Sequence, residues 1–243
     1  RFVVEGEGVW TVVNGDPVRM SRGDLLLTPG WNFHGHHNDT DHPMAWIDGL
    51  DIPFSQQMDV GFFEFGADRV TDYATPDYSR GERLWCHPGL RPLSQLRDTV
   101  ASPIGAYRWE YTDRALTEQL LLEDEGQPAT VAPGHAAIRY VNPTTGGDEM
   151  ATIRCEFHRL RESAQTKPRQ QAGSSVFQVF QGTGQVTLKG ETHRLEMGDM
   201  FVVPSWVPWS LQAETGFDLF RFSDAPIMER LHFMRTRAEG SAE

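Results

Sequence analysis

The 243-residue sequence has few cysteines and no long apolar run. Its two cysteines, Cys86 and Cys155, lie far apart and show no CxxC spacing, so a reduced cytoplasmic protein is the simplest interpretation. No apolar stretch approaches ~18 residues, and the sequence therefore predicts no transmembrane helix. The opening residues also lack the pattern of a secretory signal peptide.

Basic side chains are scarce relative to acidic ones. The chain has 22 Lys and Arg against 34 Asp and Glu, which gives a formal net charge of −12. No cluster of Lys and Arg is present, and phosphate backbones and anionic membranes are bound by such clusters. A nucleic-acid or anionic-membrane partner is therefore not expected. Because 39% of the residues are hydrophobic, we expect a folded domain with a conventional core.

One segment of the chain occurs twice. GDLLLTPGWNFHGHHN, residues 23–38, returns in degraded form as GDMFVVPSWVPW, residues 198–209, at a spacing of 175 residues. The glycine, the aspartate, the proline and the first tryptophan keep their places, whereas His34 is replaced by Trp209. The alignment extends to further pairs, namely Gly8 with Gly184, Gly15 with Gly190, Pro29 with Pro204, and Trp31 with Trp206. An internal duplication is indicated.

Each copy has short apolar or β-branched runs interrupted by glycine turns. Residues 2–13 and 24–28 are separated by a segment that begins with Asn14-Gly15, a strong hairpin signal. In the second copy, residues 176–180 and 185–188 precede a tight turn at Lys189-Gly190. The pattern predicts a mainly all-β chain with two small jelly-roll barrels. The four tryptophans of the repeats are expected in the core: Trp31, Trp46, Trp206 and Trp209.

Helical spacing occurs outside the repeats. Residues 114–123 combine this spacing with good helix formers, and Thr112 or Asp113 is the expected N-cap. Residues 124–150 are loop-like because proline and glycine recur, and residues 152–159 alternate as in a strand. The segment 225–237 predicts an amphipathic C-terminal helix.

These patterns divide the chain into three parts. We expect an N-terminal barrel over 1–65, an inter-barrel linker with helix and loops over 66–150, and a C-terminal barrel with its tail helix over 151–243. The chain opens at Arg1 inside an apolar run that already has the character of a strand. We therefore expect the N-terminal barrel to lack its first strands.

Gly23, Pro29, His34 and Asn38 are spaced as in the second sequence motif of the cupin superfamily. Two such motifs in one chain are typical of a bicupin. The opening 36 residues further resemble the gentisate and salicylate 1,2-dioxygenases, and the resemblance extends to about residue 237. It includes the segments 46–54, 83–93, 132–147 and 203–224.

The resemblance implies a ferrous ion, Fe(II), held by three histidines in the N-terminal barrel. His34 matches the third ligand, and the other two form a His-x-His pair that we expect upstream of Arg1. The same positions in the second repeat carry Arg169, Gln171 and Trp209. None of these side chains is a usual metal ligand, so the C-terminal barrel is predicted to be metal-free.

The resemblance also assigns roles near the metal. Arg1 matches an arginine whose planar fork suits a substrate carboxylate. His36 lies on the same side as His34 if the segment is extended, and it is predicted to bind substrate and to move a proton. Asp48 matches an acid that lines the same cavity, with the expected task of orienting a histidine.

The predicted function is Fe(II)-dependent ring cleavage of gentisate- or salicylate-type 2-hydroxybenzoates. Both atoms of O2 would enter between the carboxyl-bearing and hydroxyl-bearing carbons, and the resemblance implies a homotetramer. A metal-free binding or structural bicupin, or an inactive fragment of the dioxygenase, is the alternative because the sequence holds one ligand of three. A third option is another cupin enzyme, such as an isomerase or a quercetin-type dioxygenase.

Overall fold

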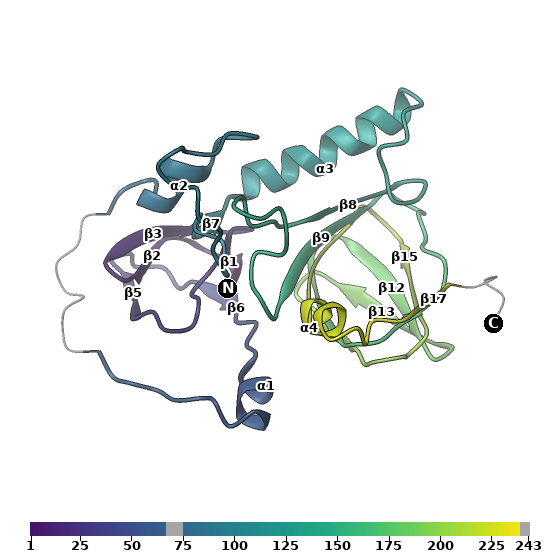
Figure 1. Ribbon diagram of the computed structural model, residues 1–243. Coiled ribbons are helices and arrows are strands. Elements are labelled where there is room, and N and C mark those ends of the chain that lie inside the picture. Colours follow the sequence, from purple (N-terminus) through teal and green to yellow (C-terminus); the bar gives the residue numbers. More distant parts are fainter. Residues whose placement is uncertain (67–74, 239–243) are drawn as a thin grey trace. The chain divides into compact units, whose positions relative to one another are not determined.

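The computed structural model describes residues 1–66 and 75–238 (Figure 1). The chain forms two compact units, an N-terminal unit of residues 1–109 and 141–150 and a C-terminal unit of 110–140 and 151–243. Across the residues described, no helix is long and apolar enough to cross a membrane. The three-part division expected from the sequence stays a prediction.

The N-terminal unit is built on two antiparallel sheets (Figure 1). One has the order β6-β1-β4-β7 and the other β3-β2-β5. The strands are β1 (Phe2–Glu5), β2 (Glu7–Val13), β3 (Asp16–Ser21), β4 (Leu25–Leu26), β5 (His34–Asn38), β6 (Ala45–Ile47) and β7 (Ala106–Tyr107). Two short helices lie between β6 and β7 in the sequence, α1 (Ile52–Gln57) and α2 (Arg80–Trp85).

Apolar side chains from both sheets form the core of this unit. They are Val3, Val9, Val18, Met20, Leu26 and Ala106, with Met44 and Trp46 packed against them. The Asn14-Gly15 turn is confirmed, since both residues have positive φ, 47° and 76°, and Val13 pairs with Asp16. The returning strand, however, begins at Asp16 and includes Pro17, whereas the sequence analysis placed it at 24–28.

A buried ion-pair network ties the segment after α2 to the first repeat. The Arg108 guanidinium bonds both Asp24, at 2.8 Å, and Glu82, with an NH2–Oε2 distance of 2.8 Å. Asp24 also accepts the backbone N–H of Ser21 and of Trp109. Burial raises the pKa of Asp24 even though Arg108 acts in the opposite direction. Each charge here depends on its partner, because an unpaired buried ion is costly.

Arg108→Met is expected to lower the free energy of unfolding by about 3–5 kcal/mol, because it leaves two buried carboxylates without a counter-charge. Hydrogen exchange at the amides of residues 1–26 under increasing urea measures the loss. Arg80→Met is the matched control, because Arg80 is largely exposed and its pair with Asp16 is worth below about 1 kcal/mol. Equal losses in the two variants would contradict the assignment.

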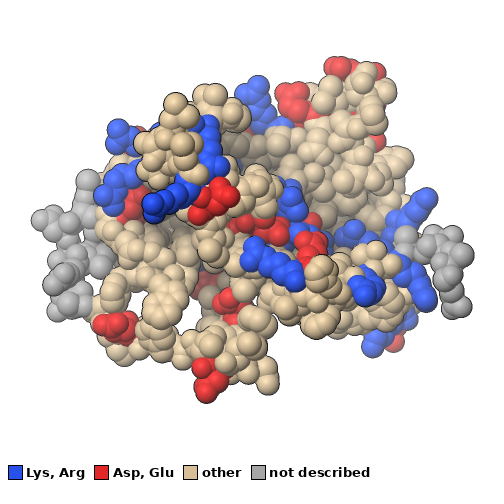
Figure 2. Space-filling view, in the orientation of Figure 1, with Lys and Arg blue, Asp and Glu red and all other residues tan. Residues whose placement is uncertain are grey.

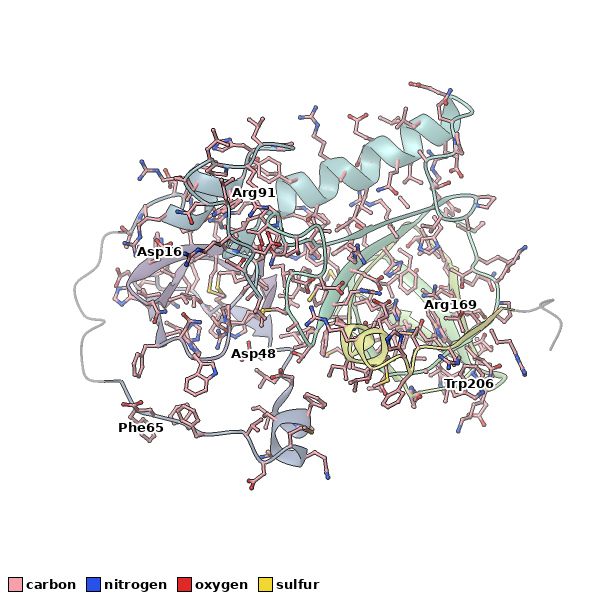
Figure 3. All side chains as sticks on the ribbon, viewed as in Figure 1. Asp16, Asp48, Phe65, Arg91, Arg169 and Trp206 are labelled. Carbon is pink, nitrogen blue, oxygen red and sulfur yellow. The ribbon has the colours of Figure 1, made fainter. Side chains whose placement is uncertain are left out.

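An apolar run lies exposed beside these sheets. None of the residues of α1 is buried, and residues 60–66, which follow it, have no regular structure. The exposed side chains are Leu50, Ile52, Phe54, Met58, Val60, Phe62, Phe63 and Phe65. Figure 2 shows the region around α1 as mostly uncharged surface, and Figure 3 labels Phe65 on the extended segment. Apolar surface of this extent is typical of an interface.

The C-terminal unit also has two antiparallel sheets. Their orders are β13-β12-β15-β10-β17 and β14-β11-β16-β9-β8. The strands are β8 (His135–Arg139), β9 (Arg154–Leu160), β10 (Arg169–Gln171), β11 (Ser175–Gln181), β12 (Thr183–Leu188), β13 (Glu191–Glu196), β14 (Met200–Val203), β15 (Trp209–Ala213), β16 (Phe217–Ser223) and β17 (Thr236–Ala238). The helices are α3 (Trp109–Asp124), which begins at the last residue before this unit, and α4 (Ala225–Arg230).

The inner faces of these sheets enclose an apolar core. It contains Leu160, Phe177, Val179, Val186, Leu195, Val203, Trp209, Leu211, Ala213, Phe217 and Leu219. Strand residues two apart share a face, so this list also identifies the inward side of each strand. On β9 the inward side is that of Leu160, His158 and Glu156, and on β16 that of Leu219 and Arg221.

The backbone repeats with the sequence. Gly23 N–H bonds the Val3 carbonyl at 2.8 Å, and Gly198 N–H bonds that of Val179 at 2.9 Å. Trp31 and Trp206 both have positive φ, 67° and 61°, which is uncommon for side chains of this size. These shared turns support the internal duplication predicted from the sequence.

The strand register matches His34 with Trp209. Val13 pairs with His34 in the first unit, and Leu188 pairs with Trp209 in the second. The expectation that the repeat tryptophans are core residues is correct for Trp209, which is 3% exposed, and for Trp46, which packs against the N-terminal core. It is wrong for Trp31 and Trp206, which are 88% and 43% exposed. The left-handed turn at Trp31 directs the indole outward.

Two expectations about helix ends are wrong. Helix α3 begins at Trp109 rather than after Thr112 or Asp113. Thr112 is buried and its hydroxyl bonds the Tyr140 hydroxyl, while Asp113 pairs with Arg159. Thr112 and Asp113, the two residues expected to cap the helix, therefore both make tertiary contacts instead.

The predicted C-terminal helix is also too long. Helix α4 ends at Arg230, and His232 has a φ of 58°, which a helix does not allow. The chain then extends as β17 and pairs with β10. A third element was missed altogether, because the loop-like stretch 124–150 contains strand β8.

Strand β8 brings two buried histidines together. His135 Nε2 lies 3.1 Å from His158 Nδ1 on β9. Burial, with the nearby charges of His158 and Arg169, lowers the pKa of His135 to about 3, and burial also lowers the pKa of His158. Both rings are therefore neutral at neutral pH in the folded protein. In an unfolded chain they would bind protons near pH 6.5.

The unfolded state thus binds more protons than the folded state between pH 6.5 and about 3, and stability falls as pH falls through this window. Each buried histidine contributes at most about 1.4 kcal/mol per pH unit. His135→Gln should flatten the loss, measured by urea unfolding at pH 7.5, 6 and 5. His193→Gln, at an exposed position of β13, should leave the slope unchanged. A slope unaltered in His135→Gln would exclude this contribution.

Candidate active site in the N-terminal unit

The turn before β5 fixes the position of His34. Asn14 N–H bonds the Phe33 carbonyl at 2.8 Å, and Phe33 N–H returns a bond to Asn14 Oδ1 at 3.0 Å. These bonds join the hairpin turn to the start of β5, so His34 enters the sheet directly opposite Val13. The side chains of His34 and His36 project on one face because they are two residues apart in a strand.

Arg1 lies next to His34. Its NH2 group is 3.1 Å from His34 Nε2, and its NH1 group donates to the Thr28 hydroxyl at 2.6 Å. Its Nε is 3.1 Å from an Asp48 carboxylate oxygen. Burial lowers the pKa of Arg1 and Asp48 raises it, so the acid offsets part of the cost of burying this charge. The guanidinium is thus held on three sides.

These contacts define the tautomer of the neutral His34 ring. A guanidinium has only donors, so His34 Nε2 accepts from Arg1 and Nδ1 carries the proton. Nδ1 then lies 3.4 Å from the Asn32 carbonyl, which it can meet only as a donor. A backbone carbonyl on one ring nitrogen is the usual arrangement for a histidine that offers the other to a metal.

His36 is held from behind by a threonine. Its Nδ1 is 3.0 Å from the Thr11 hydroxyl, and that hydroxyl donates to the sulfur of Met20 at 3.1 Å. Since the hydroxyl has one proton, both contacts are satisfied together only if His36 Nδ1 donates to Thr11. His36 Nε2 is then an acceptor. The centroid of the His36 ring is 4.9 Å from that of the Trp46 ring.

The pKa of His36 is lowered to about 4 by burial and by the charges of Arg1 and His34, which outweigh the opposite effect of Asp48. The His34 and His36 rings are 6.1 Å apart between centroids. The four residues singled out from the sequence, Arg1, His34, His36 and Asp48, therefore lie together (Asp48 is labelled in Figure 3).

Two residues of this cluster were missed by sequence analysis. Thr28 orients Arg1 and Thr11 orients His36. Threonine is common in strands, so neither residue carries a signal of its own. Thr28 stands directly before Pro29 of the repeated motif, which is the only feature that distinguishes it. His37 faces away from the cluster and pairs with Asp39.

The cluster offers two ring nitrogens as acceptors, His34 Nε2 and His36 Nε2, and the resemblance implies only His34 as a metal ligand. Within 1–66 and 75–238, no group of three or more His, Cys, Asp and Glu side chains is arranged to hold a metal. The lone pair of His34 Nε2 accepts a hydrogen bond from Arg1. The described residues thus fit one ligand of a metal site and do not complete the set.

The C-terminal unit has no counterpart of His34. Arg169 on β10 pairs with Trp209 on β15, and its guanidinium carbon lies 4.3 Å from the centre of the Trp209 ring. At the third position, the backbone carbonyl of Gln171 accepts a hydrogen bond from Trp206 N–H. An arginine stacked on an indole offers no lone pair to a metal.

The chain was compared with known proteins. The model of the cupin domain matches residues 1–52. Gentisate 1,2-dioxygenase of Streptomyces sp. is 56% identical over 236 residues, which cover 97% of this chain and 66% of the relative. The crystal structure of salicylate 1,2-dioxygenase from Pseudaminobacter salicylatoxidans shares 83% identity with a TM-score of 0.96, covering 99% of this chain and 68% of that chain.

A further structure of that enzyme, with gentisate, shares 84% identity with a TM-score of 0.97 over 99% of this chain and 66% of that chain. The duplicated two-sheet units and these likenesses confirm the predicted all-β bicupin fold. The chain belongs to the gentisate and salicylate 1,2-dioxygenase family. It spans just under two thirds of the length of the first curated relatives that it matches.

Proposed function

We propose that this chain forms the greater part of an Fe(II)-dependent dioxygenase that cleaves the ring of gentisate- or salicylate-type 2-hydroxybenzoates. The observation that carries the proposal is the contact between Arg1 and His34. It joins a carboxylate-binding group and a histidine with a defined acceptor nitrogen at one point of the N-terminal unit. The 56% identity to a gentisate 1,2-dioxygenase supports the reaction class.

Arg1 is proposed to bind the substrate carboxylate. A planar guanidinium can give a carboxylate two parallel hydrogen bonds, which fix the orientation of the aromatic ring. Thr28 and Asp48 hold the guanidinium, so little side-chain freedom remains to be lost on binding. Asp48 is thus a positioning residue for Arg1, which changes the partner expected from sequence, where it was to orient a histidine.

His36 is proposed to receive the proton of the substrate hydroxyl. Its Nε2 is an acceptor because Nδ1 donates to Thr11. The low pKa of the ring, about 4, keeps this nitrogen free of a proton at neutral pH. The proton acceptor and the carboxylate-binding group therefore both lie close to His34, and a substrate with adjacent carboxyl and hydroxyl groups could reach both.

His34 is proposed as a ligand of Fe(II), the metal that would bind O2 and the substrate oxygens. The metal needs further ligands beyond those present among the described residues, so we assign His34 alone. The C-terminal unit is proposed to be metal-free. A homotetramer and a cytoplasmic location are retained as proposals; the exposed apolar run around α1 supports an interface.

The reaction is tested with a chimera. The chain is joined to the part of the Pseudaminobacter salicylatoxidans enzyme that it does not span, loaded with Fe(II) without oxygen, and supplied with gentisate, salicylate and then O2. We expect consumption of one O2 per substrate. A correctly folded, iron-loaded chimera that takes up no oxygen with any 2-hydroxybenzoate would refute the proposal.

His34→Ala in the chimera should abolish iron retention. Trp209→His is the matched variant at the repeat position and should leave the iron content unchanged, because Arg169 and Gln171 remain beside it. Iron content after gel filtration is the measurement. Stoichiometric iron in His34→Ala would remove His34 from the ligand set.

His36→Ala should keep the iron and lower kcat about 10²-fold, the range expected for loss of one acid–base group. His42→Ala is the control, because His42 lies in an exposed loop outside the cluster. Steady-state oxygen uptake gives kcat and KM separately. Unchanged kcat in His36→Ala would assign His36 to the rim of the site.

The alternative function is a metal-free binding bicupin. It is favoured by the Arg1–His34 contact, which uses the lone pair that a metal would need. The two functions are separated by adding Fe(II) and gentisate to the chimera in turn. Gentisate binding that is unaffected by iron, without oxygen uptake, supports the binding protein.

A further inference from the structure

The C-terminal unit keeps the frame of the candidate active site but fills it with other side chains. Val3 and Val179 occupy equivalent places, as their bonds to Gly23 and Gly198 establish. Counting back two residues from Val3 and Val179 matches Arg1 with Phe177. Phe177 on β11 pairs with Arg221 on β16, so Arg221 occupies the position that Asp48 has in the first unit. Trp209 replaces His34. The interior position that carries an acid in one unit therefore carries a guanidinium in the other.

A second guanidinium reaches the same end of the interior. Arg169 stacks on the inward-facing Trp209, with its central carbon 4.3 Å from the ring centre. Figure 3 labels Arg169 among the strands of this unit. Burial lowers the pKa of Arg169 to about 10, and the charge of Arg221 acts in the same direction. Arg169 nevertheless stays cationic at neutral pH.

One carboxylate lies near both guanidinium groups but pairs with only one of them. Glu156 on β9 pairs directly with Arg221, and its oxygen lies 3.7 Å from His158 Nε2. Arg221 is further bound to the Ser175 hydroxyl at 2.7 Å. Glu156 is also the single acid that raises the pKa of Arg169.

The other charged groups nearby do not neutralise Arg169. Asp224 is influenced by Arg221 and accepts the Ser174 N–H at 2.8 Å. His135 and His158 have lowered pKa values and are neutral at neutral pH. Among the described residues, no acid therefore forms an ion pair with Arg169.

Several donors at this end have no partner. In the described part of the chain, the Arg169 side chain makes no hydrogen bond or ion pair, and its one charged or aromatic contact is the face of Trp209. Trp209 Nε1 is buried without a hydrogen-bond acceptor. The Ser223 hydroxyl, two residues from Arg221 on β16, is also buried and unpaired. Leaving the two buried groups, Trp209 Nε1 and the Ser223 hydroxyl, unsatisfied costs about 1–3 kcal/mol each.

We propose that this end of the C-terminal unit binds a small carboxylate anion on the Arg169 guanidinium, with Trp209 Nε1 as a second donor. A carboxylate accepts from a guanidinium fork and would give Arg169 the anionic partner that it lacks among the described residues. The ligand is small because Phe177, Phe201 and Trp209 pack closely here, with Phe177 and Phe201 stacked at 4.8 Å. In place of a metal held by imidazoles, this copy of the repeat holds an anion on arginine.

The site is tested with acetate and the full chain, without iron. Saturation-transfer NMR at constant ionic strength, with fluoride salts as background, should give saturable acetate binding. Arg169→Gln should weaken it about tenfold or more, the effect of losing a charge-assisted hydrogen bond. Arg194→Gln removes an equal charge from the exposed surface of the same unit and should have no effect. Arg1→Gln removes the other guanidinium proposed to bind a carboxylate, so the acetate binding that remains in this variant belongs to the C-terminal unit and should still be weakened by Arg169→Gln.

Trp209→Phe provides a second measurement in case Arg169→Gln does not fold. It keeps an aromatic ring under Arg169 and removes the N–H, so acetate affinity should fall about fivefold. Acetate should also raise the Tm of the wild type in proportion to occupancy, and less in this variant. Absence of saturable binding, binding lost in Arg1→Gln but kept in Arg169→Gln, or affinity equal in Trp209→Phe and wild type would each overturn the proposal. None of these results depends on ring cleavage.

Discussion

The pairing of β2 with β5 is the constraint on which the candidate site depends. Val13 opposite His34 determines that His34 and His36 face one side of the sheet and His37 the other. A slip of one residue would reverse all three rings. Bonds between the Asn14 turn and Phe33 prevent the slip, since they join the two ends of the paired segment. The turn at Asn14 therefore determines which face of the sheet the imidazoles of His34 and His36 occupy.

Sequence reasoning succeeded where one local rule decided the outcome. Asn14-Gly15 and Lys189-Gly190 both form turns with positive φ, and the repeated motif identified His34 and Trp209 as equivalent. The clustering of Arg1, His36 and Asp48 with His34 came from a family resemblance, because these residues are up to 47 positions apart and no local pattern joins them.

The errors arose where tertiary contacts replaced local preferences. Thr112 and Asp113 are good N-cap types, but each is engaged by a residue from another element. Periodicity over 225–237 suggested a helix, yet pairing with β10 converts its end into a strand. Thr11 and Thr28 were invisible for a related reason: their importance lies in which ring or guanidinium they touch, and threonine in a strand is unremarkable by itself.

The two copies of the repeat have diverged in charge and kept their backbone. The Gly-Asp turn is the same in both, but Asp24 is buried against Arg108 whereas Asp199 is exposed. A similar exchange occurs inside, where Asp48 of one copy corresponds to Arg221 of the other. The frame thus tolerates opposite charges at one position, provided that a partner is supplied from a neighbouring strand.

The short strand β17 has a consequence for handling the protein. It pairs with β10 at three positions, whereas β10 pairs with β15 at one, so the strand bearing Arg169 is secured mainly by a segment far later in the sequence. Affinity tags, linkers or protease nicks near residues 236–238 would thereby disturb an interior position nearly seventy residues earlier in the chain.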